Sequence, residues 1–245
     1  MRVDKVAVAV LGCAMWGAVG LAKASDCGSD LPRARIENGS VFDRGAACEG
    51  LRRAHGFFVH HGFAPRLDGD PIVYRFERVV RSPCQEAGKA SCLGPRVAGL
   101  FDADQGVVTI TTASEAWMRL PGRTYFGLRY DDELYASVLA HESTHAINKQ
   151  FYARKPTTHA QDEYIAYASQ LWSLDKKKLS DVMRKYPEKS NVFSDELNIN
   201  DVVHFTGPHA FGVMSYRHFM GPGGGGRMLR RIYSGEYQPP SFEVP

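Results

Sequence analysis

Residues 131–151 read DDELYASVLAHESTHAINKQF, and this stretch decides how the second half of the chain folds. Two aspartates open it, and their negative charge suits the N-terminus of a helix. Between residues 134 and 147 there is no proline, and Glu142 is the only charged side chain apart from the histidines. Spacings of four, three and four place four residues on one helical stripe: Leu134, Val138, His141 and His145. The stretch therefore predicts a long helix whose buried face carries two histidines.

The two histidines belong to the motif HESTH, which is an H-E-x-x-H pattern. His141 and His145 are separated by one helical turn, so their rings can converge on one tetrahedral Zn²⁺ ion. Glu142 follows the first histidine directly and cannot share its direction. Its carboxylate is therefore expected beside the metal, where it can take a proton from zinc-bound water. The motif predicts a zinc cofactor with Glu142 as the catalytic base.

A second helix is expected shortly after the first. Pro156-Thr157-Thr158 is typical of a helix start, and Gln161 is placed to form a capping box with Thr158. The helix is expected to run to about Leu174. Its inward face is predicted to hold Glu163, Tyr167 and Gln170 as well as Leu174.

Zinc needs a third protein ligand, and this second helix offers one. A carboxylate on an inward face needs a cation as its partner, so Glu163 is the predicted third ligand. Asp162 and His159 remain the alternatives. The histidines elsewhere are interpreted as surface or helix-capping residues: His60, His61 and His204.

The first 24 residues predict a cleaved signal peptide. Arg2 and Lys5 are followed by an apolar run from Val6 to Ala22, and Ala22-Lys23-Ala24 is a small-x-small cleavage site. A lipoprotein site at Cys13 is less favoured, because only six apolar residues precede it. We therefore expect a secreted or periplasmic protein with one domain from 25 to 245 and no membrane span after cleavage.

The cysteines agree with export, because four remain after cleavage. Cys84 and Cys92 bracket a short polar loop, which leaves Cys27 and Cys48 to tie down the N-terminus. The sequence permits three pairings and does not choose among them. The formal net charge of +3 does not indicate nucleic acid as a partner.

The remaining pattern predicts an α+β fold with strands before helices. Pro71–Val80 alternates as a strand does, and Val97–Thr112 is typical of a hairpin with its turn at residues 103–106. Glu49–His60 predicts a short helix, whereas residues 25–48 show no regular pattern. We expect a small antiparallel sheet followed by a mainly helical portion that contains the HExxH helix.

His141-Glu142-Ser143-Thr144-His145, with Glu163 on the following helix, resembles the gluzincin class of zinc metallopeptidases, the thermolysin and aminopeptidase group. The phrase Glu163-Tyr164-Ile165-Ala166-Tyr167 is also similar to secreted bacterial HExxH proteins grouped as a domain of unknown function. The resemblance implies a zinc-peptidase-like fold, zinc on His141, His145 and Glu163, and a peptide or protein substrate. It also implies a sheet edge that pairs with the substrate, for which Val107–Thr112 is the candidate.

The resemblance leaves two parts of the site to be found. Thermolysin-like enzymes orient a zinc histidine with an aspartate one turn after the third ligand, where this chain has Tyr167; Gln170 or a backbone carbonyl is the expected substitute. Gluzincins stabilise the oxyanion with a downstream Tyr or His, and Tyr216 and His209 on a helix predicted at Pro208–Phe219 are the candidates. Two other functions stay open, namely a secreted zinc-binding protein without turnover and a zinc amide hydrolase of the cell envelope.

Overall fold

The computed structural model describes residues 26–78, 80, 98–119, 124–151, 157–187 and 196–237. The expected signal segment lies outside these residues, and so does the expected Cys84–Cys92 loop. Cys27 and Cys48 do form a disulfide, which confirms that pairing and joins the N-terminal segment to the first helix. None of the helices in these ranges has both the length and the apolar character that a bilayer span requires.

A four-stranded sheet forms one layer of the molecule. Its strands in spatial order are β1 (Ala34–Glu37), β2 (Ile72–Glu77), β4 (Val107–Thr111) and β3 (Gly99–Asp102). β1 pairs with β2 in parallel, β2 pairs with β4 in parallel, and only β3 and β4 are antiparallel. The fold class is α+β as expected, but the sheet is mixed, so the prediction of an antiparallel sheet is wrong.

The parallel pairing has its cause in α1 (Val41–His60), which connects β1 to β2. Parallel neighbours need a crossover of a dozen or more residues, and this helix supplies it. Ser40 begins the helix with a capping box, because its Oγ accepts from the Asp43 amide at 3.1 Å and its own amide donates to Asp43. Residues 34–48 are therefore not irregular, and the helix begins eight residues before the predicted Glu49.

The β3–β4 hairpin is confirmed, with Gly106 at φ +67° in its turn. Its place in the sheet differs from the expectation, because β4 lies between β2 and β3. Val107–Thr111 is thus an inner strand, and the edge strand next to it is β3. A separate two-stranded sheet joins β5 (Thr124–Tyr125) to β6 (Leu128–Arg129).

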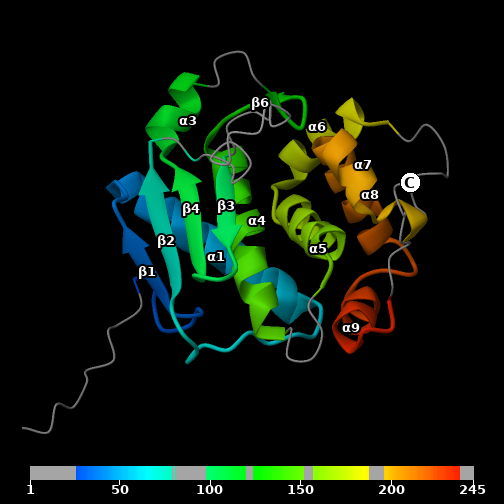
Figure 1. Cartoon of the computed structure of the whole chain (residues 1–245). Coiled ribbons are helices and arrows are strands. Elements are labelled where there is room, and N and C mark those ends of the chain that lie inside the picture. Colours follow the sequence, from blue (N-terminus) through cyan, green and yellow to red (C-terminus); the bar gives the residue numbers. More distant parts are fainter. Residues whose placement is uncertain are drawn as a thin grey trace, which may run out of the picture.

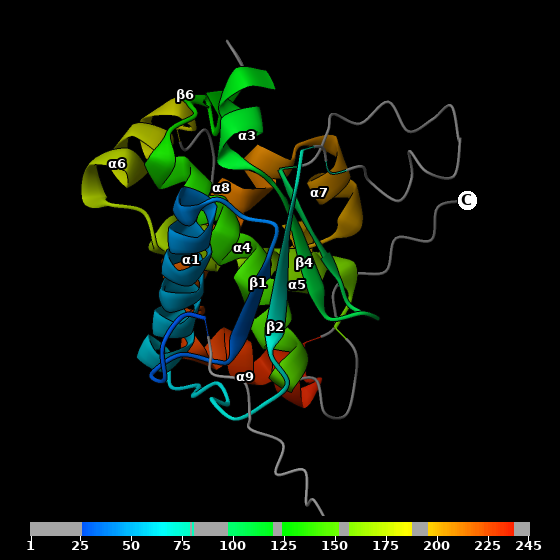
Figure 2. The same ribbon diagram turned by 90° about the vertical axis from the view of Figure 1, so that its left-hand side faces the viewer.

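The helix α4 (Asp132–Phe151) lies between the sheet and the later helices α5, α7 and α8 in the view of Figure 1. Every residue from 134 to 148 is buried, so α4 is covered on all sides rather than along one stripe. Figure 2 shows α1 and α4 on the same side of the sheet. They approach closely at Gly50, where an added Cβ would lie 2.5 Å from the Cβ of Leu139.

The helix α5 (His159–Trp172) packs against α4 from the other side and begins with the predicted capping box of Thr158 and Gln161. A short helix, α3 (Ala113–Arg119), precedes α4 in the chain. The helices that follow α5 are α6 (Lys176–Lys185), η2 (Glu196–Asn198), α7 (Asp201–Thr206), α8 (Pro208–Met220) and α9 (Gly226–Ser234). α8 confirms the helix predicted at 208–219, and α7 packs on both α5 and α8.

Candidate metal centre

The structure brings together the three residues predicted to hold a metal. The Nε2 atoms of His141 and His145 are 3.1 Å apart, as one helical turn of α4 allows. Glu163 reaches them from α5, with its Oε2 3.4 Å from Nε2 of His141 and its Oε1 3.6 Å from Nε2 of His145. Both histidines are buried, and the three side chains form a group that could hold a metal ion.

Asp162 orients one of these histidines from behind. Its Oδ2 lies 2.6 Å from Nδ1 of His145, so the Nε2 of that ring points toward Glu163. The Asn148 amide donates to the other Asp162 oxygen at 2.7 Å, and the Tyr233 hydroxyl donates to Asn148 at 2.6 Å. Asp162 therefore contacts the ring nitrogen of His145 that faces away from the group of His141, His145 and Glu163.

Gln170 does not take the orienting role expected for it. Its amide nitrogen donates to the hydroxyl of Tyr125 at 3.3 Å and to that of Ser137 at 3.2 Å. Gln170 lies about two turns after Glu163 along α5, whereas Asp162, the carboxylate that contacts His145, precedes Glu163 directly. His141 has no comparable support among the described residues: its Nδ1 is buried without a hydrogen-bond partner, and its ring meets Tyr167 edge to face at 4.5 Å.

Glu142 lies beside the cluster, on the sheet side of α4. Burial raises the pKa of its carboxyl, while His141 and His145 lower it, and the net direction is upward. The backbone of β3 comes close to the side chain at Gly99, where an added Cβ would lie 2.7 Å from both Cγ and Oε1 of Glu142. A side chain at this position would force Glu142 or the neighbouring Ile110 to shift.

The cluster is electrostatically suited to a cation. Burial lowers the pKa of His145, but Asp162, Glu163 and Glu142 raise it more, to about 10. Burial raises the pKa of Glu163, yet the imidazoles of His141 and His145 and the nearby His204 hold it well below its usual range. Three carboxylates thus act on one imidazole, and a positive charge at this point is strongly favoured.

His204 adds a group that the sequence interpretation missed. It lies on α7, and its Nε2 is 3.6 Å from Oε2 of Glu163. Its side chain is only 11% exposed, so it is neither a surface residue nor a helix cap. Burial lowers the pKa of His204 despite the opposing effect of Glu163, which keeps the ring neutral near pH 7. No periodic pattern in the sequence marks this residue, because α7 has only six residues.

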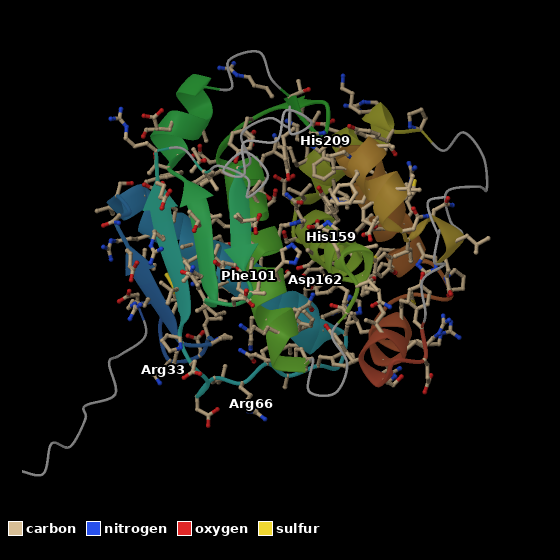
Figure 3. All side chains as sticks on the ribbon, in the orientation of Figure 1. Arg33, Arg66, Phe101, His159, Asp162 and His209 are labelled. Atoms are coloured by element: carbon tan, nitrogen blue, oxygen red, sulfur yellow. A yellow bond between two sulfur atoms is a disulfide. The ribbon has the colours of Figure 1, made fainter. Side chains whose placement is uncertain are left out.

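The two residues expected to stabilise an oxyanion lie elsewhere. The ring of His209 packs against Tyr125 and Phe126, at 4.8 and 5.0 Å between centroids, and Tyr216 packs partly buried against the core. In Figure 3, His209 lies toward the end of the molecule that carries β6, away from Asp162 and Phe101. Neither residue belongs to the groups of potential ligands in the described ranges.

The charges of Glu142 and Glu163 act on two buried tyrosines, Tyr125 and Tyr167. Burial raises the pKa of Tyr125 and of Tyr167, and the charges of Glu142 and Glu163 raise both further. Both hydroxyls therefore stay protonated near neutral pH and remain hydrogen-bond donors.

A family model matches residues 84–241, which is more than half of the chain, and it describes a family of unknown function (DUF6639). The chain belongs to this family. The DUF6639 match spans α4, α5 and α7, so every potential metal ligand lies inside it, whereas β1, α1 and β2 precede it. No curated protein and no solved structure matches the chain.

Proposed function

We propose that this chain is an exported zinc-dependent metallopeptidase of the gluzincin type. In this proposal His141, His145 and Glu163 hold the zinc ion, and Glu142 is the general base. The observation that carries the proposal is the convergence of two imidazole nitrogens and one carboxylate at 3.1, 3.4 and 3.6 Å.

The two Glu163 separations, 3.4 and 3.6 Å, fit the proposed ion, whereas the 3.1 Å between the imidazole nitrogens is slightly short for it. Ligand atoms about 2.0–2.2 Å from a tetrahedral zinc ion lie roughly 3.3–3.6 Å from one another. By contrast, the two contacts of Glu163 are longer than good hydrogen bonds, which are about 2.7–3.2 Å. An ion in the middle explains why these three buried groups face one another, and two histidines with one glutamate are a ligand set that catalytic zinc uses.

The surrounding residues support hydrolysis. A bound zinc ion supplies Lewis-acid polarisation of water and of a carbonyl group. Glu142 then accepts the proton of the attacking water and delivers it to the leaving amine, and its raised pKa suits both steps. Tyr125 and Tyr167, whose buried hydroxyls stay protonated, are the proposed hydrogen-bond donors to the developing oxyanion.

β3 is the proposed docking strand for the substrate backbone. It is an edge strand among the described strands, and the residue beside Glu142 belongs to it. Phe101 on the same strand stacks parallel to the His145 ring, with 6.4 Å between centroids. Figure 3 shows Phe101 on β3 and Asp162 on α5 with α4 between them in that view. An extended peptide along β3 would therefore run past the ligands.

Export remains part of the proposal and has one support in the structure. The Cys27–Cys48 disulfide suits an oxidising compartment, where such bonds persist.

The test measures zinc content and peptide turnover for the wild type and for Glu142→Gln, with Glu77→Gln on the exposed side of β2 as the matched control. We expect about one tight zinc ion in all three proteins. Hydrolysis of a peptide library should fall by at least about a hundredfold in Glu142→Gln only, because the general base is lost. Full activity in Glu142→Gln would contradict the mechanism.

The same experiment separates the two other functions. Zinc binding without turnover of any peptide or amide would indicate a zinc-binding protein. Turnover confined to non-peptide amides would indicate an amide hydrolase. The presence of Glu142 beside the ligands favours a catalyst over both a bare binding protein and a structural zinc site.

A further inference from the structure

A second group of potential ligands adjoins the first and shares one residue with it. His159, Glu163 and His204 each offer one ligand atom, and these atoms all lie within 4.8 Å of one another. The first group takes its histidines from α4, whereas the second takes one from the start of α5 and one from α7. Glu163 is the only residue common to both groups.

The contacts of His204 are unlike those of a residue held by hydrogen bonds. Its Nε2 lies 3.6 Å from Oε2 of Glu163, which is too long for a good hydrogen bond. Its Nδ1 is buried and has no hydrogen-bond partner within the described ranges. The same 3.6 Å is the separation expected for two ligands of one ion.

His159 approaches His204 from the other side. The centroids of the two rings are 5.0 Å apart, and Phe205 of α7 stacks on His159 at 5.3 Å with an angle of 16° between the rings. His159 is exposed, whereas His204 is mostly buried. The second group therefore opens to solvent, and an ion could enter it without passing through the first.

We propose that His159, Glu163 and His204 form a second, weaker site for a divalent transition-metal ion, with the Glu163 carboxylate bridging it to the first site. Two imidazoles and one carboxylate suit Zn²⁺ and also Co²⁺, Ni²⁺ or Cu²⁺. The electrostatics permit two ions, because Glu142 and Asp162 add two further carboxylates to the one that bridges. The exposed ligand makes this second ion the more weakly held and the faster to exchange.

This inference goes beyond the proposed hydrolysis, but it shares Glu163 with the proposed zinc site. The experiment therefore has to separate the two sites. Purified protein freed of metal is titrated with Zn²⁺ by calorimetry, and the ions retained after dialysis are counted. The wild type should bind two ions, one tight and one weaker by at least about tenfold.

Three histidine variants assign the ions. His159→Ala and His204→Ala should each keep the tight ion and weaken the second by at least about tenfold. His60→Ala, which removes a histidine at the end of α1 outside both groups, should keep both ions. Thermal melts without metal check that each variant is folded; the exposed position of His159 makes it the safer variant if His204→Ala is unstable.

Glu163→Gln tests the bridge and should weaken both ions. Two results would overturn the inference: a single ion in the wild type, or loss of the tight ion in His204→Ala, which would make His204 a fourth ligand of the first site. Failure of the proposed function gives a different pattern. In that case His141→Ala would leave the tight ion in place, whereas the ion that depends on His159 and His204 would still be counted separately.

Discussion

The two sides of α4 position their functional groups by different physical means. On the side toward the sheet, Glu142 is held by close packing against Gly99 of β3. On the side toward α5, His145 is held by a chain of hydrogen bonds through Asp162 and Asn148. Packing restricts where Glu142, the proposed base, can lie, whereas hydrogen bonds set the direction in which His145, a proposed ligand, points. A change on the sheet side should therefore alter turnover, and a change on the α5 side should alter metal affinity.

The largest effect is expected from His141→Ala, which removes a proposed ligand outright. The two remaining ligands of the first group should not retain zinc, because structural and catalytic zinc sites use three or more protein ligands. Metal analysis after dialysis should show the tight ion lost, while His55→Ala in α1 should keep it. Stoichiometric tight zinc in His141→Ala would show that the α5 side does not hold the metal.

Gly99→Ala tests the sheet side. The new Cβ would lie 2.7 Å from Cγ and Oε1 of Glu142, so the carboxylate must move. We expect turnover to fall by up to about a hundredfold, since a shift near 1 Å can cost that much. Zinc content should be unchanged, and the free energy of unfolding should fall by about 1–3 kcal/mol.

Gly56→Ala in α1 is the matched control for that variant, because a Cβ there meets nothing within 4 Å. It should raise stability by up to about 1 kcal/mol, as expected for a glycine inside a helix. If Gly99→Ala lost zinc together with activity, the sheet side of α4 would affect metal affinity as well as turnover, which would contradict the division of roles between the two sides.

Asp162→Asn tests the α5 side without removing a ligand. The amide keeps the shape of the side chain but loses the charge that supports His145, so zinc affinity should fall by about 10–100-fold. A competition assay with a chelator measures this shift. Asp181→Asn, in an exposed ion pair of α6, should bind zinc as the wild type does. Equal zinc affinity in Asp162→Asn and Asp181→Asn would contradict the proposal that Asp162 orients His145.

The smallest effect is expected from changes to a hydrogen bond on the sheet side, between Tyr74 of β2 and Ser143 of α4. The Tyr74 hydroxyl lies 2.6 Å from Oγ of Ser143, which itself donates to the carbonyl of Leu139. Tyr74→Phe removes one buried bond and should lower the free energy of unfolding by about 0.5–1.5 kcal/mol. Ser143→Ala should cost more, about 1–3 kcal/mol, because it leaves the buried Tyr74 hydroxyl unpaired. Denaturant melts compare the two, and the opposite order would contradict the assigned donor directions.

Some parts of the fold could be predicted because the signals are local. The capping box at Thr158 and Gln161 marks the start of α5, and Gly106 marks the β3–β4 turn. Ser40 and Asp43 carry the same kind of signal, and α1 accordingly begins at Val41 and not at the predicted Glu49. The parallel sheet could not be predicted, because strand partners depend on how α1 crosses from β1 to β2.

The amino-acid sequence by itself determined the pair His141 and His145, because four residues make about one turn of any α-helix. It also indicated Glu163, since a carboxylate on an inward helix face needs a positive partner. Only the tertiary structure decided that Asp162 lies behind His145, that Gly99 lies over Glu142 and that His204 reaches Glu163. These three contacts join different elements. Their distances depend on how α4, α5, β3 and α7 pack together, and residue spacing within one helix does not determine that packing.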